Sequence, residues 1–355
     1  MFIFRSKVFF LIFLYVFTLG ATSEIMSEVA VEKYIQKKLK RNHKVLRINK
    51  KNLGDKGLAI LAQSPLVRSV RTLVLYKVHI SDKGIRALAE SPNLKNLEAL
   101  YLEHNFITDK GAAIISRSRV FSNLKILNLY HNQITDTGAR AIADSDILIQ
   151  LRELNLNYNK INGSGAIELT NSKKLRQLQN IQLAYNPIEK SGKQAWKRFQ
   201  LMESFKDLHR NNRLDQVGKT LIGDFGLMVL LDFPFVSELE DLDLRNNSLT
   251  DEAVIALSNS QKFKSLVSLD LSKNNITDVG AKALAKSQNL KGLRTLNLNF
   301  NRIGDEGAKS IATSPSLEKL ESLKLGQNKI GVEGARALNE SENLKNLTHP
   351  IFGFY

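Results

Sequence analysis

A hydrophobic residue, which we call the anchor of its repeat, recurs at a fixed spacing along this chain. Neighbouring positions are 27 residues apart throughout, except for one step of 34 between Ile188 and Ile222. A period of this length is typical of solenoids, in which each repeat buries its apolar face against its neighbours. The sequence therefore predicts a single stack of repeats. These anchors are Leu53, Ile80, Ile107, Ile134, Ile161, Ile188, Ile222, Leu249, Ile276, Ile303 and Ile330.

Each repeat has the pattern of a strand followed by a helix. Leu127 and Leu129 alternate with polar residues, which is the two-residue period of a strand with one buried face. After Gly138, small apolar residues recur at the spacing of one helix face. We therefore expect an α/β architecture, with parallel strands stacked on one side and helices on the other.

Two polar positions are also repeated, and we interpret both as structural. An asparagine follows most of the predicted strands, where its amide could satisfy backbone groups from one repeat to the next. An aspartate precedes most of the helices, where we interpret it as the N-cap of that helix. The asparagines are Asn105, Asn132, Asn159, Asn186, Asn247, Asn274, Asn301 and Asn328. The aspartates are Asp55, Asp82, Asp109, Asp136, Asp224, Asp251, Asp278 and Asp305.

The cores LYLEHNFI (100–107) and LNLNYNKI (154–161) resemble leucine-rich repeats of the ribonuclease-inhibitor-like class. The helical segments GARAIA (138–143) and GAKALA (280–285) resemble the GALA-type repeats of bacterial proteins. This resemblance covers roughly residues 45–347. It implies a leucine-rich-repeat solenoid, a horseshoe with a concave parallel sheet and convex helices, and it implies a binding role.

The first 23 residues have the features of a secretory signal peptide. Arg5 and Lys7 precede an apolar run at 8–21, and small residues follow it. The run is shorter than the ~20 residues that span a bilayer, so we expect cleavage and no stable membrane insertion, with an uncleaved anchor as the alternative. The chain has no cysteine, whereas eukaryotic extracellular relatives of such repeats usually carry cysteine-paired caps. We therefore expect a secreted, periplasmic or cell-envelope protein of bacterial origin.

Three further segments depart from the regular repeat. Residues 24–44 are predicted to form a helix that caps the first open edge of the core, residues 190–221 to be irregular with one lengthened helix, and residues 348–355 to be a C-terminal cap or a truncated repeat. The capping residues expected at the N-terminus are Ile25, Val29, Tyr34, Ile35 and Leu39, and those at the C-terminus are Pro350 with Phe352 or Phe354.

Aromatic residues gather at the predicted concave positions of the N-terminal half. Five of the eight tyrosines fall there. Exposed tyrosine is typical of binding surfaces because it offers a large contact area with few rotatable bonds, although some of these rings could instead pack on one another. We interpret them as ligand-binding. These candidates are Tyr76, Tyr101, His104, Tyr130, His131, Tyr158 and Tyr185.

Metal binding and catalysis are weakly supported by the sequence. His104 and His131 lie one repeat apart and Glu103 is adjacent, but a four-coordinate site lacks a clear further ligand. No nucleophile–histidine–acid set or phosphate loop is found, so we expect no enzyme, no metal and no cofactor. Asp243 and Asp270 form a like-charge pair that could contact a cation of a partner.

The formal charge of +16 raises the question of an anionic partner. The excess basic residues are dispersed over predicted helices and turns, and export also argues against DNA or RNA, so we expect no nucleic-acid binding. The sequence predicts an exported, non-catalytic monomer that binds an unidentified protein through its concave face. The alternatives are adhesion of the basic surface to anionic envelope or host polymers, and a secreted bacterial effector.

Overall fold

The computed structural model describes residues 26–219, 221–348 and 351–352. The predicted signal segment lies outside the described residues, as do Ile25, Pro350 and Phe354 of the predicted caps. Within the described ranges, no helix combines the length and hydrophobicity of a membrane span.

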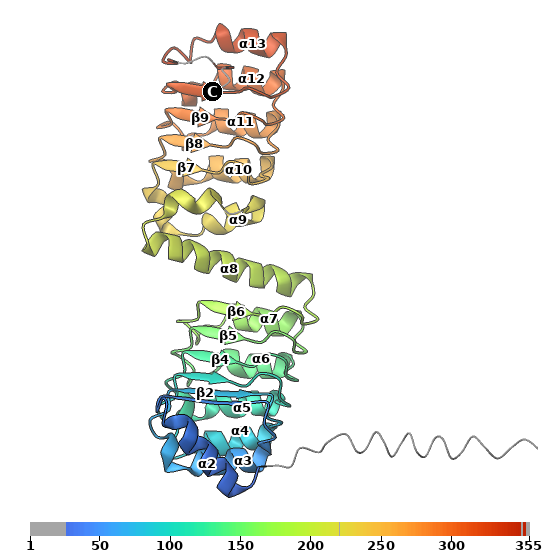
Figure 1. The fold of residues 1–355 in the computed structure, drawn as a ribbon. Helices are drawn as coiled ribbons and strands as arrows, with labels where there is room; N and C mark the ends of the chain where they lie inside the picture. The colour runs from blue at the N-terminus through green and yellow to red at the C-terminus, as the bar shows by residue number, and fades with distance from the viewer. Residues whose placement is uncertain (1–25, 220, 349–350, 353–355) are drawn as a thin grey trace, which may run out of the picture. The chain divides into compact units, whose positions relative to one another are not determined.

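The chain divides into an N-terminal unit that ends at Lys197 and a C-terminal unit that begins at Arg198 (Figure 1). The N-terminal unit contains a six-stranded parallel sheet in the order β1 to β6, and the C-terminal unit contains a four-stranded parallel sheet from β7 to β10. We expected one continuous sheet. The expectation is wrong at the 34-residue step, where the chain forms a long helix and no strand in its described residues.

In the N-terminal unit, every strand after β1 pairs in register with the strand of the preceding repeat. Its strands are β1 (Val45–Asn49), β2 (Thr72–Tyr76), β3 (Ala99–Tyr101), β4 (Ile126–Asn128), β5 (Glu153–Asn155) and β6 (Asn180–Gln182). Its helices are α2 (Glu28–Leu39), α3 (Gly54–Gln63), α4 (Asp82–Ala89), α5 (Asp109–Arg117), α6 (Asp136–Ala143) and α7 (Gly163–Thr170), followed by α8 (Lys190–Arg210), which continues into the second unit.

The C-terminal unit repeats the same alternation of strand and helix. Its strands are β7 (Asp241–Asp243), β8 (Ser268–Asp270), β9 (Thr295–Asn297) and β10 (Ser322–Lys324). Its helices are α9 (Gly223–Leu230), α10 (Asp251–Asn259), α11 (Asp278–Lys286), α12 (Asp305–Ala312) and α13 (Val332–Asn339). Short 3-10 turns lead back to several strands in both units, and η3 (Leu214–Lys219) follows α8.

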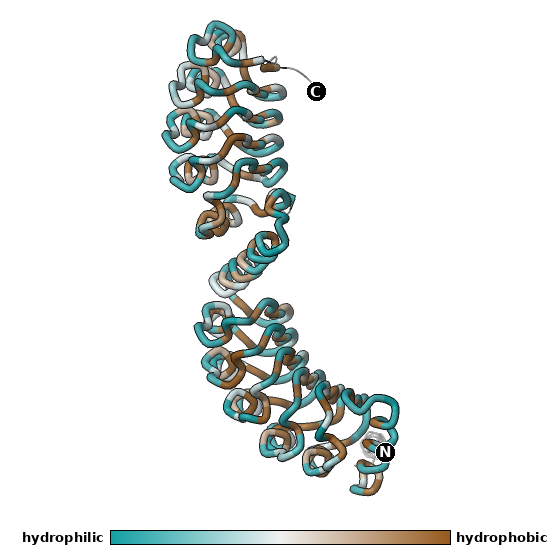
Figure 2. The backbone as a smooth tube through the Cα atoms, turned by 90° about the vertical axis from the view of Figure 1, so that its left-hand side faces the viewer, coloured by the Kyte–Doolittle hydropathy of each residue, from teal (hydrophilic) through white to brown (hydrophobic). Residues whose placement is uncertain are grey.

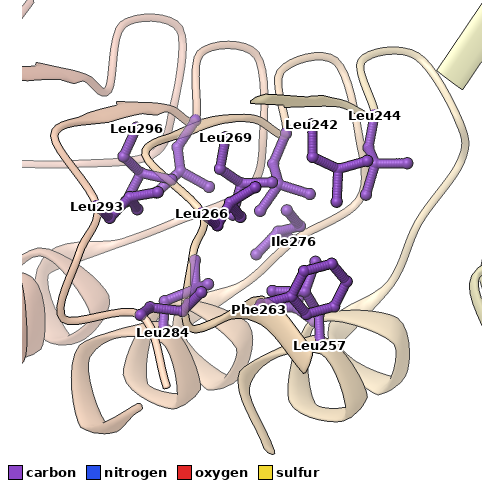
Figure 3. Packing of buried hydrophobic residues seen from close by; sticks show 14 of the residues in the cluster. Leu242, Leu244, Leu257, Phe263, Leu266, Leu269, Ile276, Leu284, Leu293 and Leu296 are labelled. Atoms are coloured by element: carbon purple, nitrogen blue, oxygen red, sulfur yellow. The ribbon is translucent and has the colours of Figure 1, made fainter. Parts of the chain in front are cut away.

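The core of each unit lies between its strands and its helices. Leu127, Leu129 and the anchor Ile134 are fully buried, and the corresponding hydrophobic residues of the other repeats are buried except Ile330, which is partly buried. Figure 2 shows hydrophobic residues along the inner side of each turn, and Figure 3 shows the leucines of β7 to β9 packed against Phe263 and Leu284. Each fully buried leucine contributes about 1.5–3 kcal/mol, so this row is the main source of stability.

The repeated asparagines connect neighbouring repeats as predicted. The Oδ1 atom of Asn132 accepts a hydrogen bond from the backbone N–H of Ile107 in the preceding repeat at 3.0 Å. Its Nδ2 donates to the carbonyls of Leu102 in the preceding repeat at 3.0 Å and Leu129 in its own at 3.1 Å. One buried amide therefore satisfies backbone groups that the turn removes from the sheet.

The repeated aspartates have a different role from the one expected. Asp109 is the first residue of α5, and the N-cap is Thr108, whose hydroxyl accepts from the backbone N–H of Lys110. Asp109 Oδ1 instead accepts from the backbone N–H groups of Thr135 at 2.7 Å and Gly138 at 3.0 Å. Each such aspartate caps the helix of the following repeat. The same contacts are made by Asp55, Asp251, Asp278 and Asp305.

Helix α2 covers the first edge of the core, and Ile35 is buried there as expected. It packs against α3 and β1, with Val31 and Ile35 buried. Val29 was expected in this face and is 62% exposed. The residues one turn apart at Val31 and Ile35 define the packed stripe, and Val29 lies outside it.

The irregular segment contains the lengthened helix that the sequence predicts. In the N-terminal unit, Trp196 of α8 donates through Nε1 to the carbonyl of Ile181 at 2.8 Å. In the C-terminal unit, Phe205 of the same helix is fully buried in the core. At the other end of the chain, the N–H of Leu325 donates to the carbonyl of Ile351 at 3.0 Å, and Phe352 packs against the last part of this core.

Candidate binding surface

The candidate residues lie at two kinds of position on the strand side of the N-terminal unit. Tyr76 and Tyr101 end β2 and β3, and Tyr130 lies two residues beyond β4. The other four were expected in strands and are instead in the turns that follow, with left-handed backbone. Their φ values are 54° for His104, 54° for His131, 55° for Tyr158 and 60° for Tyr185.

This left-handed conformation belongs to the repeat and not to a ligand site. The residue before the repeated asparagine adopts it in the C-terminal unit as well, where Asn246, Lys273 and Phe300 have φ values of 56°, 57° and 58°. Such backbone costs of order 1–3 kcal/mol at a residue other than glycine, and the surrounding turn imposes it. Only the aromatic identity of the side chains distinguishes the N-terminal unit.

Six of the seven candidates form a continuous array of rings, which we call the aromatic row. The rings of Tyr76 and His104 are 5.2 Å apart, and those of His104 and Tyr130 are 5.1 Å apart. Tyr130 and Tyr158 are 5.1 Å apart, and Tyr158 and Tyr185 stack at 4.1 Å. Offset and edge-to-face contacts of this kind add about 0.5–1.5 kcal/mol per pair beyond area burial. The row consists of Tyr76, His104, Tyr130, His131, Tyr158 and Tyr185.

The rings pack on one another and still present surface to solvent. Tyr185 is 71% exposed and Tyr158 is 38% exposed, whereas Tyr76, His104 and Tyr130 are half-buried. Tyr101 lies on the same side of β3 but is not among the ring contacts of the described residues. Both interpretations of the tyrosines, mutual packing and an exposed contact surface, therefore apply to the same side chains.

The two histidines do not converge as metal ligands would. Their rings stack at 4.4 Å with an interplanar angle of 27°. Ring nitrogens lie in the ring planes, so stacking directs them side by side and not toward a common point. Among the residues that the structure describes, no group of three or more histidine, aspartate or glutamate side chains could hold a metal ion. Burial, His131 and Lys77 lower the pKa of His104, which favours its neutral form.

Glu103 is a polar residue of this surface that sequence reasoning considered only as a metal ligand. Its Oε1 accepts a hydrogen bond from Asn128 Nδ2 at 2.9 Å. Its Oε2 is buried and has no hydrogen-bond partner among the described residues. Burial raises the pKa of Glu103, and burial together with Glu153 and Glu103 raises the pKa of Tyr101. The register of the repeats, with Glu103 between Tyr76 and Tyr130, was the available signal.

Amide side chains surround a shallow depression beside the aromatic row. It has a volume of about 70 Å³ on the exposed face of β4 to β6. Asn128, Asn155, Gln182 and the carboxylate of Glu153 line it. These groups supply hydrogen-bond donors and acceptors next to the rings, which is the composition of a polar rim around an aromatic contact area.

The acidic pair predicted in the C-terminal unit is partly neutralised within the chain. Arg245 Nε lies 2.9 Å from Asp243 Oδ2, and Arg245 Nη2 lies 3.7 Å from Asp270 Oδ2. Asp270 also accepts from the side chains of Ser272 and Asn297, at 2.6 Å and 3.0 Å. A cation from outside would have to displace these contacts, so this pair is not included in the candidate surface.

Comparison with known proteins identifies the repeats. A family model described as leucine-rich repeats (2 copies) matches residues 264–308, and a leucine-rich-repeat model matches residues 93–116, 122–143, 150–169, 238–258 and 316–338. In the comparison with curated proteins, no sequence matches the chain.

Two solved structures from Listeria monocytogenes are similar to the chain. One is an internalin (inlF), with 19% identity and a TM-score of 0.24 over 94% of this chain and 91% of that one. The other is internalin C2 (inlC2), also with 19% identity and a TM-score of 0.24, over 79% of this chain and 80% of that one. From its repeated strands, asparagines and helices and from the matching family models, the chain contains leucine-rich repeats and has an α/β solenoid fold.

Proposed function

We propose that this is a non-catalytic protein that binds another protein through the strand side of its N-terminal unit. The aromatic row is the observation that carries the proposal. Its rings are held in a fixed array by the repeat and remain open to contact at Tyr158 and Tyr185. Rigid, preordered aromatic surface loses little conformational entropy on binding, and such residues dominate the energetics of protein interfaces.

The basic residues on the helices are less suited to be the contact surface. Several of them have an acidic neighbour within the chain, such as Lys309 with Glu306 at 3.2 Å and Arg336 with Glu333 at 3.7 Å. These exposed pairs contribute little to stability, but they reduce the local positive field that an anionic polymer would meet. A protein partner that contacts the aromatic row is therefore preferred to adhesion through the helices.

The test compares two aromatic residues at the same position of the repeat. A partner captured with residues 24–355 is titrated against the Tyr158→Ala and Phe300→Ala variants. Phe300 is 50% exposed and has the same left-handed backbone, but it lies in the C-terminal unit. We expect Tyr158→Ala to weaken binding by at least ~2 kcal/mol, about 30-fold, and Phe300→Ala to leave it within about twofold.

Salt separates this proposal from adhesion by charge. Diffuse charge contacts weaken steeply as ionic strength rises, whereas a buried aromatic interface changes little. We expect the affinity to fall only slightly between about 0.05 and about 0.5 M salt, a range that spans the screening of exposed charges. If Tyr158→Ala has no effect and all binding disappears at moderate salt, the basic helix side is the functional surface instead.

We also propose that the protein is exported from a bacterial cell. The support is the basic start, the apolar run at 8–21 and the small residues after it. Expression of the precursor in a bacterium with a Sec system should give mature protein that has lost 20–23 residues. N-terminal sequencing of periplasmic or secreted material measures this, and full-length protein in the cytosol would contradict it.

Within the leucine-rich repeats, we propose assignment to the ribonuclease-inhibitor-like class, with repeats of GALA type. The 27-residue period and the small-residue helices, such as GAKALA at 280–285, support this assignment.

A further inference from the structure

The first strand of the N-terminal unit has an edge without a neighbouring strand. Arg47 of β1 is the register equivalent of Asn128 in β4. The carbonyl of Asn128 accepts a hydrogen bond from the N–H of Leu102 in the preceding repeat at 2.8 Å. No repeat precedes β1, so the carbonyl and N–H of Arg47 point outward from the sheet, and those of Asn49, two residues further on, point the same way.

This edge is accessible in the described part of the chain. Arg47 and Asn49 are exposed, and no group of the described residues forms a hydrogen bond to their backbone on the open side. The last strand of the C-terminal unit differs, because the N–H of Leu325 donates to the carbonyl of Ile351 at 3.0 Å. The chain therefore supplies an extended segment to one end of its sheets, and among the described residues it supplies none to β1.

Basic residues surround the open edge. Eight of the fifteen residues from 37 to 51 are lysine or arginine and none is acidic, so this stretch departs from the dispersed charge expected elsewhere. All eight are exposed, and none forms an ion pair with an acidic side chain of the described residues. They extend from the last turn of α2 through β1 to the segment that follows it. These residues, which we call the basic edge, are Lys37, Lys38, Lys40, Arg41, Lys44, Arg47, Lys50 and Lys51.

An extended acidic polypeptide matches both features of this surface. Its backbone pairs with the open N–H and C=O groups, since a strand added to a sheet edge is held by main-chain hydrogen bonds. Its carboxylates meet cations along about 16 Å, because each of the five residues of β1 rises about 3.3 Å. A second copy of this chain fits less well, because two basic edges repel each other. Nucleic acid or anionic lipid would use the charge but leave the backbone groups unpaired.

We propose that the β1 edge binds an extended, acidic segment of another protein as an added strand. The site uses β1, which carries no residue of the aromatic row, and it goes beyond the binding function proposed above. Lysine and arginine at a sheet edge keep sheets of like charge apart. Here the same charge attracts an acidic segment, which then completes the backbone hydrogen bonds of Arg47 and Asn49.

The first experiment uses the whole protein and synthetic peptides. The parent peptide alternates glutamate and valine and is about seven residues long, which is enough to span β1. Two control peptides carry methyl groups on one or the other set of alternate backbone nitrogens, so they keep the charge. We expect one control to bind at least tenfold more weakly in calorimetry, because only one set of N–H groups faces β1. Equal binding of all three peptides shows attraction by charge alone and overturns the added strand.

Amide hydrogen exchange measures the pairing directly. Binding of the parent peptide should slow exchange at the N–H groups of Arg47 and Asn49 at least tenfold in nuclear magnetic resonance spectra. The N–H of Ile48 faces β2 and should change little. Peptide binding without protection of Arg47 and Asn49 contradicts the proposal.

Variants test the charge. Arg47→Glu reverses the cation in the middle of the basic edge and should weaken binding of the parent peptide at least tenfold. Lys282→Glu, at an exposed lysine of α11 in the C-terminal unit, makes the same change in net charge and should alter the affinity less than twofold. Melting temperatures show that both variants are folded, as expected for exposed side chains. Unchanged affinity in Arg47→Glu rules the site out.

Other occupants and the proposed function are tested separately. A single-stranded oligonucleotide and vesicles of anionic lipid are titrated under the same conditions. If either binds while the parent peptide does not, the basic edge is a site for other polyanions and the proposal is wrong. Tyr158→Ala should leave the affinity for the peptide within about twofold. Failure of the peptide to bind therefore leaves the aromatic row standing, and failure of Tyr158→Ala to weaken partner binding leaves the β1 edge standing.

Discussion

Asn132 holds two repeats together through a single amide group. Its hydrogen bonds reach the backbone of Ile107 and Leu102 in one repeat and of Leu129 in the next. All of these groups are buried, so water cannot replace the amide if it is removed. The stability of the solenoid therefore depends on such residues in addition to the leucines.

Replacing Asn132 tests whether its amide contributes to the stability of the solenoid. Asn132→Ala leaves several buried backbone groups unsatisfied, and we expect the free energy of unfolding to fall by about 2–4 kcal/mol in urea titrations. The neighbouring Gln133 is exposed, and Gln133→Ala should change stability by no more than about 0.5 kcal/mol. Similar losses for the two variants would show that the amide contacts contribute little.

Glu103 gives a prediction for the pH dependence of stability. Its pKa in the folded state is raised by burial, so the unfolded chain releases this proton at lower pH than the folded chain does. The folded state is therefore disfavoured as pH rises from the unfolded value, about 4.3, through the folded value. We expect Glu103→Gln to be more stable than the natural protein at pH 7 and to lose this advantage below about pH 4 in thermal melts. An advantage that does not change with pH would contradict the assigned burial of the carboxylate.

At the scale of residues, the sequence predicts the buried leucines and asparagines better than the side chains of the surface. The asparagines were recognised because an amide that recurs directly after the strands matches the backbone groups that a turn leaves unpaired. The left-handed backbone of His104 and Tyr158 was missed, because the alternating pattern continues past the point where the strand ends. Whether Glu103 Oε2 has a hydrogen-bond partner depends on which side chains neighbour it in space, and no local sequence pattern predicts that.

At the scale of elements, most of the repeat helices are tied to an aspartate of the preceding repeat. Asp109 Oδ1 accepts from two backbone N–H groups at the start of α6, and its Oδ2 accepts from the Thr135 hydroxyl at 2.7 Å. The sequence places aspartate and glycine near the same helix end, which looks like a local cap. The helix that receives the cap lies 27 residues further on. Interpreting each aspartate as the N-cap of its own helix was therefore wrong.

Gly138 makes this arrangement possible. We expect Gly138→Ala to destabilise the protein, although alanine normally stabilises a helix relative to glycine. A Cβ atom there would lie 2.6 Å from Asp109 Oδ1 and 2.8 Å from Ile134 Cγ2. Helix propensity alone predicts that Gly138→Ala stabilises by about 1 kcal/mol, whereas the steric overlap predicts a net loss of about 1–3 kcal/mol. Chemical denaturation decides between them, and a more stable Gly138→Ala variant would contradict the close packing of aspartate and glycine.

At the scale of the whole molecule, the 34-residue step changes the sheet more than the sequence indicates. The altered spacing and the helical pattern at 191–208 predicted an irregular region with a long helix, and α8 confirms the helix. The division into two sheets was not predicted, because the pattern shows a lengthened step between Ile188 and Ile222 but not that the described residues before Ile222 form no strand.

Limited proteolysis tests where the chain is least protected. Arg210, Arg213 and Lys219 are exposed, and the described residues around them form a helix end and a 3-10 turn without sheet pairing. We expect trypsin to cut first between residues 210 and 219, because local opening there breaks few buried contacts. Mass spectrometry should then identify two main fragments that are divided between residues 210 and 219. First cuts within α3 to α6 would contradict this assignment.

The central claim is that the aromatic row is the surface that meets the partner. Hydroxyl-radical footprinting of the free protein and of its complex with the captured partner measures this directly, side chain by side chain. We predict that oxidation of Tyr130, Tyr158 and Tyr185 decreases in the complex while that of Phe300 stays unchanged. Unchanged oxidation of these tyrosines, with protection confined to the helices or to the C-terminal unit, would contradict the claim.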